Sequence, residues 1–293
     1  MIEKLAQFGP SAQRAVRPLD ERALRPSLPD RTTRIAWRGW GSGKKNVLLL
    51  HGGAGSWTHW IRSIDALDDA YTLWIPDLPG CGDSDDAAPP ATYESIAQAL
   101  ARDLRDLIDT PEQLAIVGFS LGAQFALRLA HLCAARTTDL VLVGANLVDH
   151  TGRPARPLIN WKKAATEAEV LAAMRNNLNV MMLADPANID AQALELYTTD
   201  VVRSRMRISD LGEHQPLVNA LAGIPAHIRV TGISGDADQV FHEVLSRQRE
   251  SLRRFRPDAE FHLIENGGHW VMYEAADAFN EILRSTLAAG SSR

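Results

Sequence analysis

The strongest structural signal in the sequence is residues 114–130, which read LAIVGFSLGAQFALRLA. The apolar run at residues 114–117 predicts a short buried strand, and residues 121–135 predict a helix. Between them lies Gly118-Phe-Ser-Leu-Gly122. A strand that passes directly into a helix must bend sharply, and glycines on both sides of the bend keep side chains from striking the strand and the helix. The segment therefore predicts a tight strand–turn–helix unit with Ser120 at its tip.

The alternation of strand and helix continues in both directions from this unit. Continuous runs of Val, Ile and Leu are typical of strands buried on both faces, and the helices between them carry apolar residues at three-to-four spacing. This pattern predicts an α/β fold with a mostly parallel central sheet and helices on both faces. Strands are expected at residues 34–37, 47–50, 72–75, 114–117, 139–143, 228–233 and 260–264, and helices at residues 93–109, 121–135, 240–253 and 272–288.

Two parts of the chain depart from the alternation. Residues 149–222 contain no convincing strand and carry helical stripes, such as Val170, Met174, Leu178 and Met181. We expect them to form a helical cap inserted between two core strands. Residues 1–30 have scattered Pro and Arg with no clear period and are expected to form an N-terminal arm. The expected core is then residues 31–148 together with residues 223–293.

Composition argues against several function classes. The chain has 293 residues, of which 45% are apolar and 23% charged, and its net charge is -5 at pH 7. It therefore offers no basic stripe for nucleic acid and no polybasic patch for a membrane surface. Its apolar runs are far shorter than the about 20 residues that span a bilayer, and its first residues do not resemble a secretory signal. Because Cys81 and Cys133 have no metal-binding spacing, we expect a cytoplasmic protein with reduced thiols and no metal.

Ser120 has the surroundings of a catalytic nucleophile. A G-x-S-x-G pattern between a strand and a helix is the signature of a nucleophile elbow, in which the serine is held in a strained backbone conformation. Acyl transfer also needs two N–H donors for the oxyanion. We assign these donors to the amides of Gly53, in the turn His51-Gly-Gly-Ala-Gly55, and of Leu121, at the start of the helix. His51 itself is expected to hydrogen-bond within the turn.

The other members of a catalytic triad are expected after the last two strands. A serine hydroxyl needs an imidazole to take up its proton and return it to the leaving group. Among nine histidines, His269 stands out because it follows a predicted strand in the glycine loop Gly267-Gly-His-Trp270. A carboxylate must fix the tautomer of that imidazole, and two candidates, Asp236 and Asp238, follow the strand at 228–233. All of these groups lie at carboxyl ends of strands, where ligands bind in α/β sheets.

These motifs together resemble the α/β-hydrolase fold superfamily across about residues 31–288. The stretch Pro76-Asp-Leu-Pro-Gly-Cys-Gly-Asp-Ser84 is similar to the D-x-P-G-x-G-x-S loop common after the fourth strand of these enzymes. The resemblance implies that the triad acid occupies the last position of G-x-x-D, which here is Asp238, and that the chain order is Ser, Asp, His. It also implies that the insertion at 149–222 is the helical cap that these enzymes carry over the site.

Within the superfamily, the cap and the GGHW-x-x-x-E-x-x-x-x-F-N ending are similar to meta-cleavage-product hydrolases, which break carbon–carbon bonds in dienoate ring-fission products. Those enzymes commonly have Asn where this chain has Phe119, and a longer oxyanion loop. We therefore expect a serine hydrolase that cleaves carboxylic esters, with a carbon–carbon hydrolase as the alternative. A non-catalytic ligand-binding module on the same scaffold is the alternative from another class. Haloalkane dehalogenases and epoxide hydrolases of this fold use an Asp nucleophile. The serine at position 120 therefore argues against both classes.

The residues around these motifs predict an apolar substrate pocket. Trp57, Phe119 and Trp270 flank the oxyanion turn, the nucleophile and the histidine, and we expect them to line a pocket for a small apolar or aromatic ester or ketone. Trp60 is equally compatible with packing. Met174, Met181 and Met182 either form an adaptable apolar lid or, as is more common for Met on a helical stripe, pack within the cap. The cluster Arg203-Ser-Arg-Met-Arg207 either binds a substrate carboxylate or is a solvated helix face. The mechanism needs no cofactor.

Overall fold

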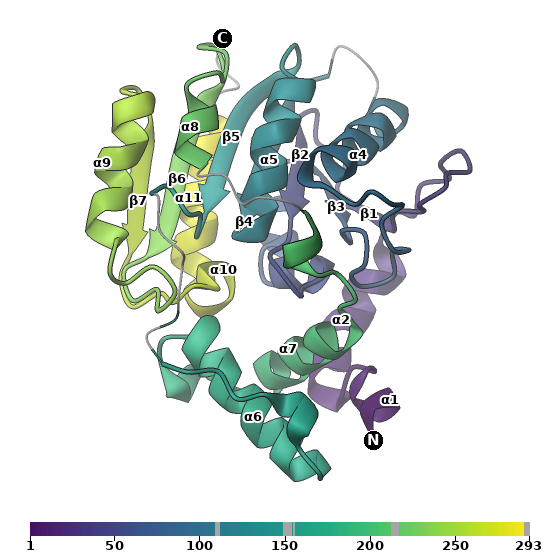
Figure 1. Cartoon of the computed structure of the whole chain (residues 1–293). Helices are drawn as coiled ribbons and strands as arrows, with labels where there is room; N and C mark the ends of the chain where they lie inside the picture. Colours follow the sequence, from purple (N-terminus) through teal and green to yellow (C-terminus); the bar gives the residue numbers. More distant parts are fainter. Residues whose placement is uncertain (109–111, 149–153, 155, 212–216, 290–293) are drawn as a thin grey trace.

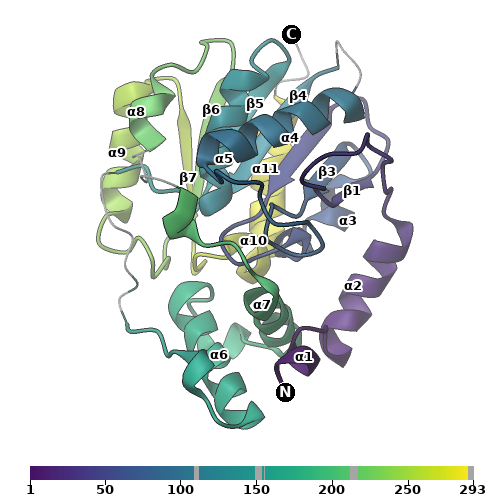
Figure 2. The same ribbon diagram turned by 45° about the vertical axis from the view of Figure 1, so that its right-hand side comes forward.

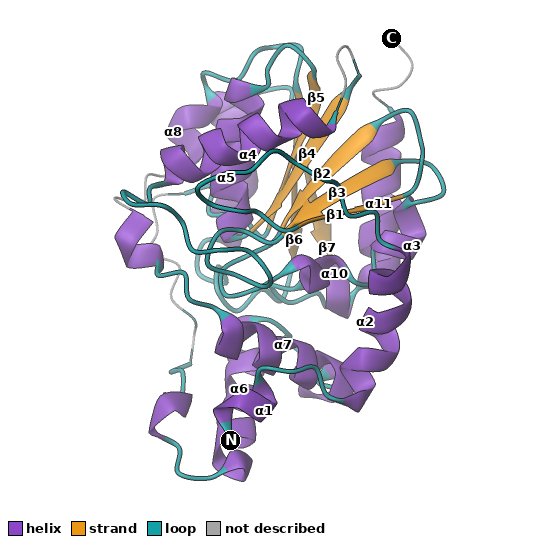
Figure 3. Ribbon diagram, turned by 90° about the vertical axis from the view of Figure 1, so that its right-hand side faces the viewer, coloured by secondary structure: helices purple, strands orange, loops and turns teal. Residues whose placement is uncertain are grey.

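The architecture is three-layered, with a central sheet between two layers of helices (Figures 1 and 3). The structure, a computed structural model, describes residues 1–108, 112–148, 154, 156–211 and 217–289. The sheet has seven strands in the order β1-β3-β2-β4-β5-β6-β7. All neighbouring strands are parallel except β1, which pairs antiparallel with β3. The prediction of a mostly parallel sheet is therefore confirmed. The strands are β1 Trp37–Trp40, β2 Asn46–Leu50, β3 Thr72–Pro76, β4 Leu114–Phe119, β5 Thr137–Val143, β6 Arg229–Gly235 and β7 Glu260–Ile264.

Helices cover both faces of the sheet because the central strands are apolar throughout. Every residue of β2 and β4 is buried, so both faces of these strands need a covering layer. One face carries α4 Tyr93–Leu107, α5 Leu121–Leu132, α8 Leu217–Leu221 and α9 Leu245–Phe255, and the other carries α3 Ile64–Leu67 and α11 Ala276–Ala288 (Figures 2 and 3). The short helix α10 Val271–Glu274 leads into α11.

A helical insertion lies beyond the carboxyl ends of the parallel strands, between β5 and β6 (Figure 1). It contains η2 Trp161–Lys163, α6 Glu167–Met181, η3 Pro186–Asn188, α7 Ala191–Arg203 and η4 Ile208–Leu211. Local sequence determines where its helices begin. Thr166 and Glu169 form a capping box at α6, and the Asp190 carboxylate accepts the Ala193 N–H at the start of α7. In the part of the chain that the structure describes, no helix is both long and apolar enough to cross a bilayer.

The N-terminal residues form helices that their sequence did not indicate. They form α1 Ile2–Leu5 and α2 Pro10–Arg22, and α2 packs along α7 of the insertion (Figure 3). Ala12, Val16 and Leu19 give α2 a buried stripe at three-to-four spacing. This stripe is short, and its partner α7 lies about 180 residues away in the sequence, which is why no period was evident among the Pro and Arg residues.

Three predicted boundaries were wrong for identifiable reasons. Strand β1 begins at Trp37, because the backbone of Arg34 bonds to the loop after β3 and not to a strand. Helix α9 begins at Leu245, because the Asp238 carboxylate holds the preceding residues in turns. Helix α8, placed in the expected cap, packs against α5 and α9 of the core. Residues 149–153, 155 and 212–216 of the expected cap lie outside the described residues.

Candidate active site

The turn between β4 and α5 holds Ser120 in an unusual backbone conformation. Its φ of 50° and ψ of −115° are costly for a residue with a Cβ, and its amide is fixed by a 2.8 Å hydrogen bond to the Val143 carbonyl. The two motif glycines are required by close approach. A Cβ on Gly118 would lie 2.6 Å from the Ala126 Cβ, and one on Gly122 would lie 2.5 Å from the Leu50 carbonyl oxygen. The sharp turn therefore exposes the serine hydroxyl at the carboxyl edge of the sheet.

The structure brings Ser120, His269 and Asp238 together in one hydrogen-bonded chain. His269 Nε2 lies 3.0 Å from Ser120 Oγ, and His269 Nδ1 lies 2.8 Å from Asp238 Oδ2. His269 is 3% exposed and Asp238 is fully buried. The second carboxylate oxygen of Asp238 accepts the backbone N–H of Val240 at 2.8 Å, which fixes its orientation. This geometry suits an imidazole that accepts the serine proton while a carboxylate stabilises the resulting cation.

The other acidic candidate has a different partner. Asp236 Oδ1 accepts the backbone N–H of Asn266 at 2.7 Å and so closes the turn between β6 and the loop after β7. Within the described residues, no hydrogen bond joins Asp236 to His269. The two carboxylates are thus separated in role, with Asp238 facing the imidazole and Asp236 holding the loops.

Two backbone amides, from different segments, belong to residues in the wall of the cavity that contains Ser120. Gly53 and Leu121 both line the cavity that contains Ser120, and neither amide donates a hydrogen bond to any described residue. Leu121 is the first residue of α5, so its N–H has no partner within the helix. The turn that carries Gly53 is closed by a bond from the Gly55 N–H to the Gly52 carbonyl. Two amides that have no partner among the described residues are thus available at this cavity.

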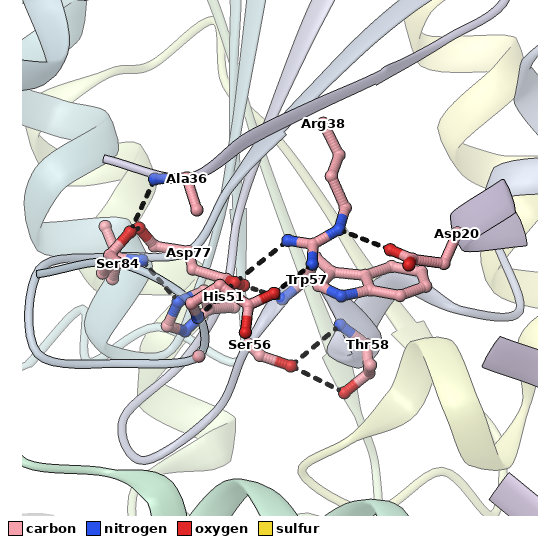
Figure 4. Close-up of polar contacts among 12 residues, drawn as sticks. Asp20, Ala36, Arg38, His51, Ser56, Trp57, Thr58, Asp77 and Ser84 are labelled. Carbon is pink, nitrogen blue, oxygen red and sulfur yellow. Dashed lines mark hydrogen bonds and ion pairs between the residues drawn. The ribbon is translucent and has the colours of Figure 1, made fainter. Parts of the chain in front are cut away.

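Buried polar groups, including His51 and Asp77, hydrogen-bond to the backbone of this turn and the segments beside it (Figure 4). His51 Nδ1 donates to the Gly52 carbonyl, and its Nε2 accepts the Leu78 N–H at 2.8 Å. Burial lowers the pKa of His51, which keeps the imidazole neutral and able to accept. Asp77, in the loop after β3, accepts the Trp57 N–H at 2.8 Å and a guanidinium N–H of Arg38 at 3.1 Å. His51 thus has the structural position that the sequence analysis expected.

A cavity of about 530 Å³ opens above Ser120 between the core and the helical insertion. Its walls are mostly apolar and come from the turn of residues 51–55 (the expected oxyanion turn), the strand–turn–helix unit of Ser120 and the insertion. Asn177 and Asn160 add polar side chains, but both amide atoms of Asn177 are bonded to the backbone of Ile159. Apart from His269, no described residue brings a basic side chain to the cavity wall.

The predicted pocket residues are only partly placed there. Phe119 lines the cavity, whereas Trp57 and Trp270 do not, and this part of the prediction was wrong. Trp57 is buried against Trp40, and Trp270 is buried and stacks on Tyr273. A residue next to a site residue in sequence can point to the opposite side of the backbone. Both tryptophans do so, because their side chains lie in the core. The aromatic walls come instead from insertion residues that the sequence did not single out, Trp161 and Tyr197.

Of Trp60 and the three methionines, some side chains pack in a core and others line the cavity. Trp60 is fully buried and packs against Phe279 in the core. Met174 belongs to the apolar core of the insertion. Met181 and Met182 line the cavity, so the adaptable apolar surface expected of the insertion is supplied by these two side chains.

The arginine cluster at the end of α7 binds protein groups. Arg203 pairs with Asp83, and Arg205 pairs with Asp86 and donates to the Ser84 carbonyl. These contacts attach the insertion to the loop after β3. Arg207 is exposed and lies outside the cavity wall. The suggestion that the cluster binds a substrate carboxylate is therefore wrong for Arg203 and Arg205.

Glu274 is a site residue whose role the sequence did not reveal. Its carboxylate accepts the backbone N–H of Gly268 at 2.7 Å, beside His269, and those of Ala184 and Asp185 at 2.9 Å. It therefore ties the histidine loop to the end of the insertion. The only available signal was its place in the GGHW-x-x-x-E pattern, which gives no role for the carboxylate.

Comparisons with known proteins agree with this architecture. The sequence pattern of the alpha/beta hydrolase family matches residues 47–282. A 2-hydroxy-6-oxononadienedioate/2-hydroxy-6-oxononatrienedioate hydrolase of Paraburkholderia phymatum is 26% identical over 275 residues, which cover 87% of this chain and 91% of the relative. A 2-hydroxy-6-oxo-6-phenylhexa-2,4-dienoate hydrolase of Burkholderia cepacia is 27% identical over 83% of this chain and 88% of the relative.

Solved structures show the same fold at lower identity. Carboxylesterase CesB of Bacillus subtilis superposes with a TM-score of 0.75 at 16% identity, covering 98% of this chain and 99% of the esterase. The meta-cleavage product hydrolase CumD of Pseudomonas fluorescens superposes with a TM-score of 0.70 at 21% identity, covering 87% of this chain and 94% of the hydrolase. Since the family pattern covers most of the sequence and the seven-stranded sheet matches these structures, the chain belongs to the alpha/beta hydrolase family.

Proposed function

We propose that this hydrolase cleaves small neutral carboxylic esters through an acyl-enzyme formed on Ser120. The observation that carries the proposal is the hydrogen-bonded chain from Ser120 through His269 to Asp238, which opens into an apolar cavity beside two free amides. His269 takes the serine proton as the hydroxyl attacks the ester carbonyl, and the amides of Gly53 and Leu121 bind the oxyanion. His269 then gives the proton to the departing alkoxide.

The second half of the reaction repeats these roles with water. His269 removes a proton from water, the hydroxide attacks the acyl carbonyl, and the proton returns to Ser120 as the acid leaves. Asp238 keeps the imidazole in the tautomer that accepts at Nε2 throughout. Apart from the ester and water, the proposed cycle uses side chains and backbone amides of this chain.

The cavity wall supports a neutral, apolar substrate. A carboxylate buried in this cavity would need a cationic or donor-rich partner, because an unpaired charge in an apolar site is strongly disfavoured. The described walls offer no basic side chain apart from His269, and Asn177 is already bonded to Ile159. An acyl or aromatic group can instead pack against Phe119, Met182 and Tyr197.

The test is a panel of p-nitrophenyl esters with wild type and Ser120→Ala. We expect turnover of acetate to hexanoate esters and a loss of at least about 1000-fold in kcat for Ser120→Ala. Ser209→Ala, which removes an exposed hydroxyl outside the cavity, is the matched control and should behave as wild type. Rapid labelling of Ser120 by a fluorophosphonate would also exclude a non-catalytic binding module, and substantial turnover by Ser120→Ala would overturn the proposal.

A second candidate is cleavage of carbon–carbon bonds in dienoate ketones. It is favoured by the relatives, whose names describe hydrolases of such compounds at 24–27% identity. Comparing kcat/KM for a 2-hydroxy-6-oxo-dienoate with that for p-nitrophenyl butyrate separates the two. A dienoate preference of more than about tenfold would make this candidate the better description.

The cytoplasm is the compartment that we propose for the enzyme. Cys81 and Cys133 are both free and buried, which suits a reducing environment.

A further inference from the structure

A buried carboxylate lies where the helical insertion meets the core. Asp200 is on α7, and its side chain is 4% exposed. Thr58 Oγ1 donates to Asp200 Oδ2 at 2.8 Å, and the Ser56 hydroxyl also stabilises the charged form of the carboxylate. None of the proposed chemical steps uses Asp200. A carboxylate that is costly to bury and has no part in the chemistry needs another explanation.

Both hydroxyls belong to the short helix η1 Trp57–Trp60 and its cap. Ser56 is the N-cap of η1, where its Oγ accepts the Thr58 N–H at 3.2 Å and lies 2.9 Å from Thr58 Oγ1 (Figure 4). From the core side, Asp77 accepts the Trp57 N–H. The helix is therefore held by one carboxylate of the core and one carboxylate of the insertion.

Helix η1 in turn supports the oxyanion turn. His59 Nδ1 accepts the Gly52 N–H at 3.2 Å, and a Cβ on Gly55 would lie 2.2 Å from the His59 ring. Burial, with further contributions from His51 and His269, lowers the pKa of His59 well below its ordinary value, so the imidazole stays neutral and accepts. Any movement of η1 therefore moves the peptide that precedes Gly53.

From this continuous path of contacts, we propose that Asp200 is a positioning residue for the oxyanion site. Through Ser56, Thr58 and His59, its carboxylate sets the place of the Gly53 amide. The inference rests on the proposed function, because it assigns the support of one of the two oxyanion donors.

The charges around Asp200 explain how the support responds to pH. Burial raises the pKa of Asp200 to about 7, with a further rise from Asp77 and an opposing effect of Arg203 on the same helix. The thiol of Cys81, in the loop after β3, stays protonated because burial raises its pKa to about 12. On α2, which also packs against α7, Asp20 pairs with Arg38 and Arg25. A pKa of about 7 means that the charge of Asp200 changes near neutral pH.

Two variants test the proposal with p-nitrophenyl butyrate. Asp200→Ala should lower kcat by about 10- to 100-fold with KM within about twofold of wild type, since loss of a whole oxyanion donor costs about 100- to 1000-fold. Asp200→Asn keeps one acceptor oxygen but loses the negative charge and the second acceptor oxygen. Its kcat should match wild type at pH 5.5 and fall about 3- to 10-fold below it at pH 8.5, because charged acceptors bind more strongly.

Glu195→Gln is the matched control. Glu195 is on the same helix, but its carboxylate accepts the Ala12 N–H of α2 and does not contact η1. The ratio of its kcat to that of wild type should not change with pH. A boronic acid inhibitor, whose adduct with Ser120 occupies the oxyanion site, should weaken in Asp200→Ala in proportion to kcat. If Asp200→Ala does not fold, Thr58→Val provides the same kcat and boronate comparison.

The outcomes separate this inference from the proposed function. If Ser120→Ala abolishes turnover while both Asp200 variants retain wild-type kcat at every pH, the positioning role is refuted and the serine mechanism stands. A rise in KM with unchanged kcat would also refute it, because Asp200 would then only dock the insertion. Turnover by Ser120→Ala would refute the mechanism itself.

Discussion

Replacing Asp200 by Asn should make the stability of the protein depend less on pH. Burial raises the pKa of Asp200 from an ordinary value of 3.8 to about 7 in the folded chain. The folded state therefore binds a proton more tightly than the unfolded state. Wild-type stability contributed by this group is fully present below pH 3.8 and is lost as pH rises toward 7. The separation of about three pH units, at about 1.36 kcal/mol per unit, gives a loss of about 4 kcal/mol.

The assay is urea unfolding followed by tryptophan fluorescence at several pH values between 4.5 and 8.5. Other ionisable groups act equally on both proteins, so the difference between the two unfolding free energies isolates Asp200. That difference should rise in favour of Asp200→Asn by several kcal/mol across the range, while its esterase kcat falls relative to wild type. Parallel stability curves would show that the carboxylate is not protonated near neutrality, and the reasoning would be refuted.

Three further changes probe the site and its supports. Asp238→Asn should lower kcat by about 10 000-fold in ester assays, because the amide favours the wrong imidazole tautomer, whereas Asp236→Asn should retain most of the activity. Gly122→Ala should yield little folded protein by circular dichroism, because its Cβ would lie 2.5 Å from the Leu50 carbonyl oxygen; a normal melting curve would contradict this. Glu274→Gln should lower both melting temperature and kcat, since an amide replaces one acceptor oxygen with a donor facing backbone N–H groups near His269.

The sequence was sufficient to predict the strand–turn–helix unit at Ser120 and the grouping of the three residues of the proposed triad. Ser120, Asp238 and His269 each follow a strand in a short loop, and parallel strands deliver their carboxyl ends to one edge. The local sequence pattern and the strand topology are therefore enough to place the three residues near one another. The choice between Asp236 and Asp238 came from resemblance, because two carboxylates two residues apart differ only in the direction that the folded turn gives them.

Side-chain direction and distant packing could not be predicted in the same way. Trp57 and Trp270 are adjacent in sequence to the oxyanion turn and to His269, yet both point into the core. The cavity walls come from Trp161 and Tyr197, whose positions depend on how the insertion docks. Asp200 follows two threonines in α7, and nothing in the local sequence marks it as buried; its hydrogen bond to Thr58 depends on how α7 docks against η1.

Some of the places where this chain departs from ordinary folding rules lie at the cavity or on the elements that form it. Ser120 and Ala54 both adopt positive φ without being glycine, and Asp200 is a buried carboxylate with an ionic partner only at a distance. Each departure costs free energy, so the surrounding structure must over-determine it. The supports are visible: the Gly118 and Gly122 contacts hold the elbow, while η1 and its two carboxylates hold the oxyanion turn. One of those carboxylates, Asp200, belongs to the insertion. The covering helices and the proposed active site are therefore joined through η1, and we expect a movement of the insertion to alter the position of the oxyanion turn.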